Sequence, residues 1–348
     1  MISDDSKPSS SRRIPQREIA ERAGVSVSTV SRVLNNAAGI SESVQQRVLA
    51  VAAELGYQRN GSRQAGRVQN ISLLTSLPLA PALDPFHADV LSGVEAACGR
   101  EGLHLNYATL GTSMANAETV LERLRQNGVD GLLLLSIDDP ALIEAIRGLN
   151  APLVMINVDQ RELPLDTFLP DNRQGALLAV RHLIAHGHRR ILHITASQRR
   201  TIRRRTEAYR AALEEAGIPF DPQLVIDVPI NAESAYEAMQ RRLAAGPPDF
   251  TAAFCANDLA AMGLMRAAQE AGLRIPQDLS VVGFDDIATA AFLSPPLTTV
   301  RIETAELAAL AVRRLLDRAA ARDLTPIRVS LACRLIERQS VARPRTRG

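Results

Sequence analysis

The stretch AERAGVSVSTVSRVLNN, residues 20–36, sets small residues, apolar pairs and one arginine around a single glycine. Just upstream, QREIAERA places Ile19 and Ala23 on one face of a helix. Gly24 can end that helix, because glycine accepts the left-handed backbone of a tight turn. Ser26 has the side chain to cap a second helix, and a third apolar helical pattern follows the segment NNAAGI. Three short helices joined through a glycine turn predict a helix-turn-helix.

The open face of the predicted second helix carries residues suited to DNA. Short side chains let a helix approach base edges in the major groove, and arginine can grip guanine, so Val27, Ser28 and Arg32 are the candidate base readers. The hydroxyls of Thr29 and Ser31 suit phosphate contacts, which position a helix without specifying sequence. A small helical bundle with an accidental glycine turn would show the same spacing and is the alternative at this point.

Basic residues gather at the amino-terminal end of the chain. Residues 1–67 hold ten Lys and Arg against six Asp and Glu, whereas the rest of the 348 residues holds thirty against thirty-two. A basic excess at one end is typical of a nucleic-acid-binding segment. The polar opening MISDDSKPSSSRR predicts a disordered tail over residues 1–13 without the apolar region of a signal peptide, and no run is long enough to span a membrane. We therefore expect a cytoplasmic protein with no membrane partner.

The residue types that carry metal, redox or nucleotide chemistry form no motif. Cys98, Cys255 and Cys333 are far apart, which favours three buried thiols over disulfides or a zinc site. His182 and His186 have the i, i+4 spacing of a metal-binding pair, but no cysteine or carboxylate stands nearby. The chain also lacks the phosphate-binding loops, the GxSxG elbow and HExxH. We expect no metal, no cofactor and no enzyme activity.

Short apolar runs alternate with helical patterns from residue 71 onward. They are ISLLTSL, LHLNYATL, GLLLLSI, PLVMINV, RILHIT, TAAFCA and LSVVGF. Near-continuous apolar strands between helices indicate parallel sheets covered on both faces. Seven such strands are many for one small sheet.

The chain resembles the LacI/GalR family of bacterial transcription regulators. EIAERAGVSVSTVSRVLNN and ISESVQQRVLAVAAELGY are similar to the family's DNA-binding headpiece. VDGLLLLS, DNRQGALLAVRHLIAHGHRRILHI, FTAAFCANDLAAMGLMRAAQEAGLRIPQDLSVVGFDD and SPPLTTVR are similar to landmarks of its regulatory core, in the same order. The resemblance covers nearly the whole chain and disfavours the accidental bundle.

This resemblance implies a helix-turn-helix headpiece and an α/β core of two Rossmann-like subdomains that resemble periplasmic binding proteins. The chain would cross between the subdomains near residues 168, 297 and 326. The expected boundaries are a headpiece over 14–58, a hinge linker over 59–69, a core over 70–340 and a basic tail over 341–348. Within the core, one subdomain would comprise 70–168 and 297–326, and the other 169–296 and 327–340.

The hinge departs from the family's pattern. In the family this segment becomes a short helix on DNA, and a leucine wedges into the minor groove. Tyr57 and Asn60 stand where the resemblance places them, but Arg59 replaces the usual proline and Gly66 falls at the wedge leucine. We therefore expect weaker operator bending, with Arg63 and neighbouring arginines reaching phosphates.

Polar residues follow the predicted strands, at the sheet edge where α/β folds bind ligands. The resemblance aligns Arg205, Asn257 and Asp285 with residues that hydrogen-bond the effector. Asn157 stands where sugar-binding relatives often carry aspartate, and its amide leaves a neutral hydroxylated ligand open. Asn and Asp also favour helix caps and turns, which is the structural alternative for each of them.

Other positions bear on the same cleft. Asp258 and Asp286 are assigned to helix caps and turns rather than to ligand. Phe86 is the candidate aromatic wall, with core packing as its alternative. Ile230 lies where sugar-binding members often stack an aromatic ring, so the usual pyranose platform is missing.

The run QRRTIRRRTEAYR, residues 198–210, leads into the expected cleft. Arg203 and Arg205 are two residues apart, a spacing that could clamp a carboxylate or phosphate, which favours an anionic or acid-sugar effector. Most charge runs are solvated surfaces, and that is the alternative for the group.

Taken together, the residues and the resemblance predict a ligand-responsive, sequence-specific DNA-binding transcriptional regulator. We expect a repressor of carbohydrate or related small-metabolite genes that binds a sugar or sugar-acid effector. A homodimer would let two headpieces read a pseudo-palindromic operator in double-stranded DNA. The alternatives are a small-molecule-binding protein without strong operator bending, or an enzyme on the same α/β core.

Overall fold

The computed structural model describes residues 16–34, 40–55, 68–76, 84–111, 114–321 and 323–345. The chain divides into two compact units, one up to Arg67 and one from Val68 onward. Each unit has its own core, and each is described by itself. No helix among the described residues is long and apolar enough to cross a membrane.

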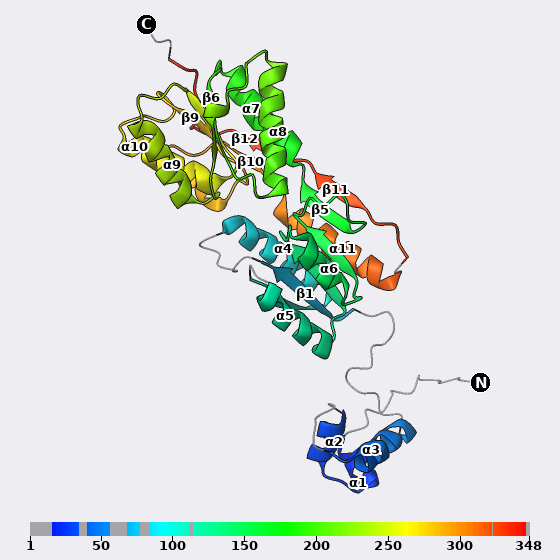
Figure 1. The fold of residues 1–348 in the computed structure, drawn as a ribbon. Coiled ribbons are helices and arrows are strands. Elements are labelled where there is room, and N and C mark those ends of the chain that lie inside the picture. Colours follow the sequence, from blue (N-terminus) through cyan, green and yellow to red (C-terminus); the bar gives the residue numbers. More distant parts are fainter. Residues whose placement is uncertain are drawn as a thin grey trace, which may run out of the picture. The chain divides into compact units, whose positions relative to one another are not determined.

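The smaller unit is built from three helices, α1 (Gln16–Ala23), α2 (Val27–Leu34) and α3 (Glu42–Glu54) (Figure 1). Each helix contributes apolar side chains to one cluster, in which Ile19, Val30 and Val48 are fully buried. The apolar spacing read from the sequence therefore does bring one face of each helix together. The predicted helix-turn-helix is confirmed.

The first sheet of the larger unit is parallel and six-stranded, in the order β11-β5-β4-β3-β1-β2. Its strands are β1 (Asn70–Thr75), β2 (His104–Thr109), β3 (Gly131–Leu135), β4 (Leu153–Ile156), β5 (Asp166–Pro170) and β11 (Arg328–Leu331). Helices surround it: α4 (Pro85–Glu101), α5 (Met114–Asn127), α6 (Pro140–Arg147) and α11 (Thr304–Ala320) (Figure 1). Alternate strand residues enter two different clusters, Leu73 with α4 and α11 and Leu74 with α5 and α6. The sheet is therefore covered on both faces, as its continuous apolar runs predict.

The second sheet is parallel and four-stranded, in the order β7-β6-β8-β9. Its strands are β6 (Ile191–Thr195), β7 (Val225–Asp227), β8 (Ala252–Cys255) and β9 (Ser280–Val282). Its helices are α7 (Asn172–Ala185), α8 (Arg200–Glu215), α9 (Ala232–Ala244) and α10 (Asp258–Glu270), with 3₁₀ turns at Pro222–Leu224 and Ala288–Phe292. Ile191 packs in the cluster of α7 and α8, whereas Leu192 packs with α9 and α10. This sheet too has helices on both faces.

The chain passes from one sheet to the other where β5 leads into α7, and again around an antiparallel pair, β10 (Thr299–Arg301) with β12 (Arg334–Ile336). One expected boundary needs correction. The expected second subdomain includes 327–340, but β11 pairs with β5 and so belongs to the first sheet. The third crossing therefore lies after Leu331, not near residue 326.

The described part of the expected basic tail lies against the second sheet. The amide of Ala342 donates to Ser280 Oγ at 3.0 Å, and Arg345 lies 3.5 Å from Asp278. Residues 341–345 thus continue the core rather than leave it. The three cysteines are free and buried, as the sequence indicates.

Candidate DNA and effector sites

The turn between α1 and α2 is fixed by two residues. Gly24 has φ +64, and the amide of Val25 donates to Ala20 O at 3.1 Å, which closes the end of α1. Ser26 Oγ accepts from the amide of Thr29 at 3.1 Å, so Ser26 caps α2 as predicted. The cap sets the direction in which the first turn of α2 leaves the glycine.

The start of α2 presents small side chains to solvent. Val27 is 46% exposed and Ser28 is exposed, whereas Val30 and Val33 are buried in the three-helix core. Thr29 is half-buried and Arg32 is exposed. A helix face with small side chains, hydroxyls and one guanidinium matches what major-groove reading requires.

Some predicted DNA contacts cannot be placed. Tyr57, Asn60 and Arg63 lie outside the described residues, as does the side chain of Ser31. They remain predictions.

The carboxyl edge of the first sheet carries a group of polar side chains. Asp84 and His87 follow β1, and His87 Nδ1 lies 2.6 Å from Asp84 Oδ2. Asn157 follows β4 with φ +55, and its amide nitrogen donates to Ser136 Oγ at 2.9 Å. Asp138 follows β3. These side chains meet because the carboxyl ends of parallel strands share one edge.

Three buried polar atoms in this group have neither a hydrogen bond nor an ion-pair contact with any residue that the structure describes. They are His87 Nε2, Asp138 Oδ1 and Asn157 Oδ1. Buried polar atoms in native proteins almost always have a partner, because an unmade hydrogen bond costs about 1–3 kcal/mol. Two acceptor oxygens and one imidazole nitrogen at this edge are therefore available to form hydrogen bonds with a ligand.

The second sheet contributes two arginines to the same region. Arg199 Nε donates to Asp138 Oδ2 at 3.0 Å, and its Nη2 donates to Asn157 O at 3.4 Å. Arg205 is 3% exposed and donates from Nη1 to Asp285 Oδ1 at 3.3 Å. The polar edges of the two sheets are thus in direct contact.

Arg205 is held on several sides. Its Nε donates to Asn172 Oδ1 at 2.8 Å, its Nη1 also donates to Ala256 O, and its guanidinium lies 3.6 Å from the ring centroid of Phe284. A charge this deep needs such contacts, because burial lowers the pKa of the Arg205 guanidinium. Its position is therefore strongly fixed.

Burial also changes the carboxyl groups. It raises the pKa of Asp285 to about 7, although the nearby Arg205 opposes that rise. Burial alone would raise the pKa of Asp84, but the hydrogen bond and charge of His87 outweigh it and hold that pKa below its usual value. Two carboxyls of one site thus differ in charge near neutral pH.

No cluster of histidine, cysteine and acidic residues able to hold a metal occurs among the described residues. Instead, the histidines of RHLIAHGHRR make protein contacts. His186 Nδ1 lies 2.8 Å from His182 O, and the buried His188 contacts Thr251 Oγ1 at 2.8 Å and Ala342 O at 2.8 Å.

Comparison with known proteins agrees with both units. A model of bacterial regulatory proteins of the lacI family matches residues 17–60, and a model of a periplasmic binding protein-like domain matches residues 180–341. The ribose operon repressor of Haemophilus influenzae is 36% identical over 303 residues, covering 87% of this chain and 91% of that protein.

The chain belongs to the lacI family of bacterial regulatory proteins. Among solved structures, a transcriptional regulator CelR–cellobiose complex has a TM-score of 0.73 at 31% identity, covering 94% of this chain and 100% of that one. The Lac repressor dimer bound to operator and the anti-inducer ONPF has a TM-score of 0.71 at 27% identity, covering 95% and 100%. This LacI-family member is a DNA-binding transcriptional regulator with a periplasmic-binding-protein-like core.

The LacI-family core places the predicted effector residues unevenly. Asn157, Arg205 and Asp285 lie in the polar region between the sheets. Asn257 borders it, but it caps α10: its Oδ1 accepts from the amide of Ala260 at 2.8 Å and its Nδ2 donates to Ile230 O at 3.0 Å.

The cap assigned to Asp258 is therefore made by its neighbour Asn257. The carboxylate of Asp258 is buried, accepting from Thr299 Oγ1 at 2.5 Å and from the amide of Ile287 at 2.9 Å. Phe86 is 8% exposed and belongs to the largest core cluster, which agrees with its packing alternative.

The predicted arginine clamp is not formed. Residues two apart on a helix point in different directions. Arg203 is exposed and donates to Ser197 O at 2.9 Å, whereas Arg205 is buried against Asp285. The run is not simply a solvated surface either, because four of its six arginines pair with carboxyl groups: Arg199, Arg200, Arg204 and Arg205.

Sequence reasoning missed Asp84, His87 and Asp138 as site residues. Each stands shortly after a predicted apolar strand, which is the same signal that identified Asn157.

Proposed function

We propose that this LacI-family regulator is a repressor whose effector binds where the carboxyl edges of the two core sheets meet. The observation that carries the proposal is the group of three buried atoms without described partners, His87 Nε2, Asp138 Oδ1 and Asn157 Oδ1. A bound small molecule would satisfy them and would contact both sheets at once. Such a ligand can change the angle between the subdomains and so alter DNA affinity.

The chemistry of these atoms favours a neutral, hydroxyl-rich effector over an acid. Asp138 Oδ1 and Asn157 Oδ1 are acceptors and need donors, which sugar hydroxyls supply. Asp84, Asp138 and Asp285 also place three carboxyl groups in the region, and both arginines that enter it already have carboxylate partners. We therefore propose a neutral sugar as the effector, instead of the anionic effector that the arginine run led us to expect. The names of two similar proteins, a ribose operon repressor and a regulator in complex with cellobiose, agree with this class.

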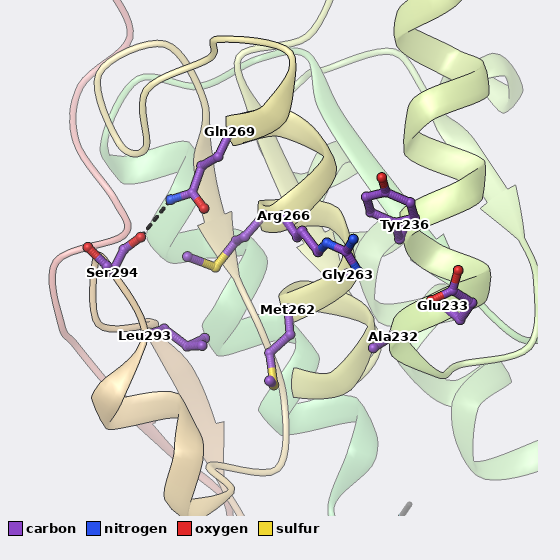
Figure 2. A pocket seen from close by; sticks show the side chains of 10 residues that line it. Ala232, Glu233, Tyr236, Met262, Gly263, Arg266, Gln269, Leu293 and Ser294 are labelled. Atoms are coloured by element: carbon purple, nitrogen blue, oxygen red, sulfur yellow. Dashed lines mark hydrogen bonds between the residues drawn. The ribbon is translucent and has the colours of Figure 1, made fainter.

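We also propose that the protein acts as a homodimer through a face of the second sheet's helices. A pocket of about 270 Å³ opens there, and Met262, Leu293 and Ser294 are among the side chains that line it (Figure 2). Beside it, Phe292 is 87% exposed, a strong exposure for a phenyl ring. A two-fold pairing would seat Phe292 of each copy against the other's pocket, and the similar Lac repressor structure is described as a dimer on its operator.

DNA binding also bears on where in the cell the protein acts and on whether it is an enzyme. A repressor acts on the chromosome, so we propose that it works in the cytoplasm and catalyses no reaction of its own. The two helix-turn-helix units of the dimer would read a pseudo-palindromic operator.

A thermal-shift experiment on the full chain tests the effector class. D-ribose and cellobiose are the neutral probes, and D-ribonic and cellobionic acids are their acidic counterparts. A ligand that binds the native state raises the melting temperature by mass action. We expect at least one neutral probe to raise it and neither acid to do so.

The matched variants are Asn157→Gly and Asn150→Gly. Both residues have positive φ, +55 and +53, which glycine adopts without strain, but Asn150 is exposed in the loop before β4. Asn157→Gly should weaken the stabilising sugar about tenfold, and Asn150→Gly should leave it unchanged. Stabilisation by the acids alone, or an equal effect of the two variants, would overturn the proposed site.

A further inference from the structure

We propose that Arg199, Arg200 and Arg204, called here the arginine latch, hold the two core sheets together in the absence of effector. The latch sits at the start of α8, which belongs to the second sheet, and its partners all follow strands of the first sheet. The inference concerns regulation of the proposed effector site and rests on the proposed movement of the two halves.

Three ion pairs form the latch. Arg199 Nε lies 3.0 Å from Asp138 Oδ2, Arg200 Nη1 lies 2.9 Å from both oxygens of Glu162, and Arg204 Nε lies 2.8 Å from Asp159 Oδ2. Asp138 follows β3, whereas Asp159 and Glu162 follow β4. Every pair therefore crosses from one sheet to the other.

Asp159 is the buried centre of the arrangement. It is 2% exposed, and besides Arg204 it pairs with Arg328 on β11 and lies 3.4 Å from Arg161. Burial alone would raise the pKa of Asp159, but the hydrogen bond from Arg204 and the surrounding arginine charges hold that pKa below its usual value. One carboxylate thus joins α8, β11 and its own loop.

The basic residues at the start of α8 are unfavourable for the amino terminus of a helix. This indicates that these arginines are present for contacts outside α8. The amino terminus of a helix carries partial positive charge and favours acidic residues. The first turn of α8 has no acidic residue, its N-cap is Arg199, and that residue makes no side-chain capping bond. Positions that break a local rule are expected to serve the larger structure.

The latch has a built-in control in Arg203. It lies in the same run but is exposed, and among the described residues it donates only to Ser197 O, within its own half. A general effect of positive charge on α8 would include Arg203, whereas a latch would not.

The latch would set how often the two halves separate. Ion pairs that are partly exposed weaken with salt, and the Arg200 and Glu162 side chains are 35% and 66% exposed. If an effector favours the closed arrangement, a weaker latch lowers its apparent affinity, because the competent state is less populated.

Spin-label distance measurements on the full chain test this without effector or DNA. Cysteines replace the exposed Thr119 on α5 and Arg241 on α9, and the three native thiols are buried. Labelled protein is mixed with excess unlabelled protein so that a dimer holds at most one labelled copy. Distances are compared at low salt and at 1 M NaCl.

We expect the unsubstituted chain at low salt to show one distance between the two labels, and at high salt an additional, longer one. Glu162→Arg and Arg204→Gln should show the longer distance already at low salt. Adding Arg200→Glu to Glu162→Arg restores the opposite charges and should remove that distance. Arg203→Gln should leave the distribution unchanged.

The inference fails if both latch variants match the unsubstituted chain at each salt concentration, or if the charge swap restores nothing. Glu162 is a surface residue, so its variant remains informative even where Arg204→Gln disturbs folding. Because no ligand enters the measurement, a negative result leaves the proposed function standing, and failure of the thermal-shift test leaves the latch standing.

Discussion

At Asp285 the backbone adopts a φ of +112, and the amide donates to Val300 O at 2.8 Å. The carboxyl group is buried and faces the guanidinium of Arg205, with the charges of Asp84 and Arg199 close enough to shift its pKa. Because that pKa is raised to about 7, the group changes charge near neutral pH. The same residue thus links the effector region to pH.

The number of protons bound to Asp285 in the folded and unfolded chain predicts how stability changes with pH. The folded chain keeps a proton on Asp285 up to about pH 7, whereas the unfolded chain releases it near the ordinary aspartate pKa of 3.8. Stability therefore falls as pH rises between these values and levels off above them. Melting temperatures of the unsubstituted chain and of Asp285→Asn, measured from pH 4.5 to 8, should converge or cross as pH rises. A difference between them that does not vary with pH would contradict the raised pKa.

Individual site residues were only partly predictable from sequence. Asn157, Arg205 and Asp285 all lie in the polar region between the sheets, because each follows or faces a strand end, and their contacts to an effector stay predictions. The cap expected at Asp258 is made by Asn257, since either residue type can cap a helix and only the backbone decides which one does. The arginine clamp failed for a different reason: residues 203–205 are helical, and helical spacing separates the two side chains.

Among the helices and strands, α2 is the one predicted to read DNA bases. Its buried valines hold it in the headpiece, and its exposed face carries Val27, Ser28 and Arg32. One face of α2 therefore packs in the headpiece core, and base reading is predicted for the opposite face.

Arg32→Ala tests that assignment. An arginine that reads guanine contributes about 1–3 kcal/mol of discrimination, so the variant should bind its operator about tenfold or more weakly while binding random DNA nearly as before. Fluorescence anisotropy with both duplexes, at fixed salt, measures the ratio. Arg123→Ala, an exposed arginine on α5 of the core, is the control and should change neither affinity. Equal losses on both duplexes would assign Arg32 to phosphate instead.

The strands divide clearly into predictable and unpredictable ones. All seven apolar runs form strands, because burial on both faces demands continuous apolar sequence. The five missed strands are short or polar: β5 contains Asp166 and Pro170, and β11 alternates half-buried and exposed residues at the sheet edge. Their pairing depends on tertiary neighbours, which is why the third crossing was placed a few residues too early.

The whole molecule is proposed to act as a dimer of two copies of this chain. Phe292 is exposed and precedes Leu293, which lines the pocket with Met262, and we predict that Phe292→Asp separates the dimer by placing a charge at the apolar contact. Sedimentation velocity across a concentration series should show a shift to monomer, with a matching loss of operator affinity. Glu237→Lys, an exposed charge change on α9, should stay dimeric. A dimeric Phe292→Asp protein would move the interface elsewhere.

A LacI-family chain that regulates transcription must select particular DNA sequences, and recovery of bound fragments from random double-stranded DNA measures that selection. We predict enrichment of one pseudo-palindromic sequence whose half-sites share a motif, because a two-fold dimer presents two identical α2 helices. The enrichment should be lost in Arg32→Ala. Recovery of no shared motif, or of a single asymmetric site bound equally well by Arg32→Ala, would contradict the account.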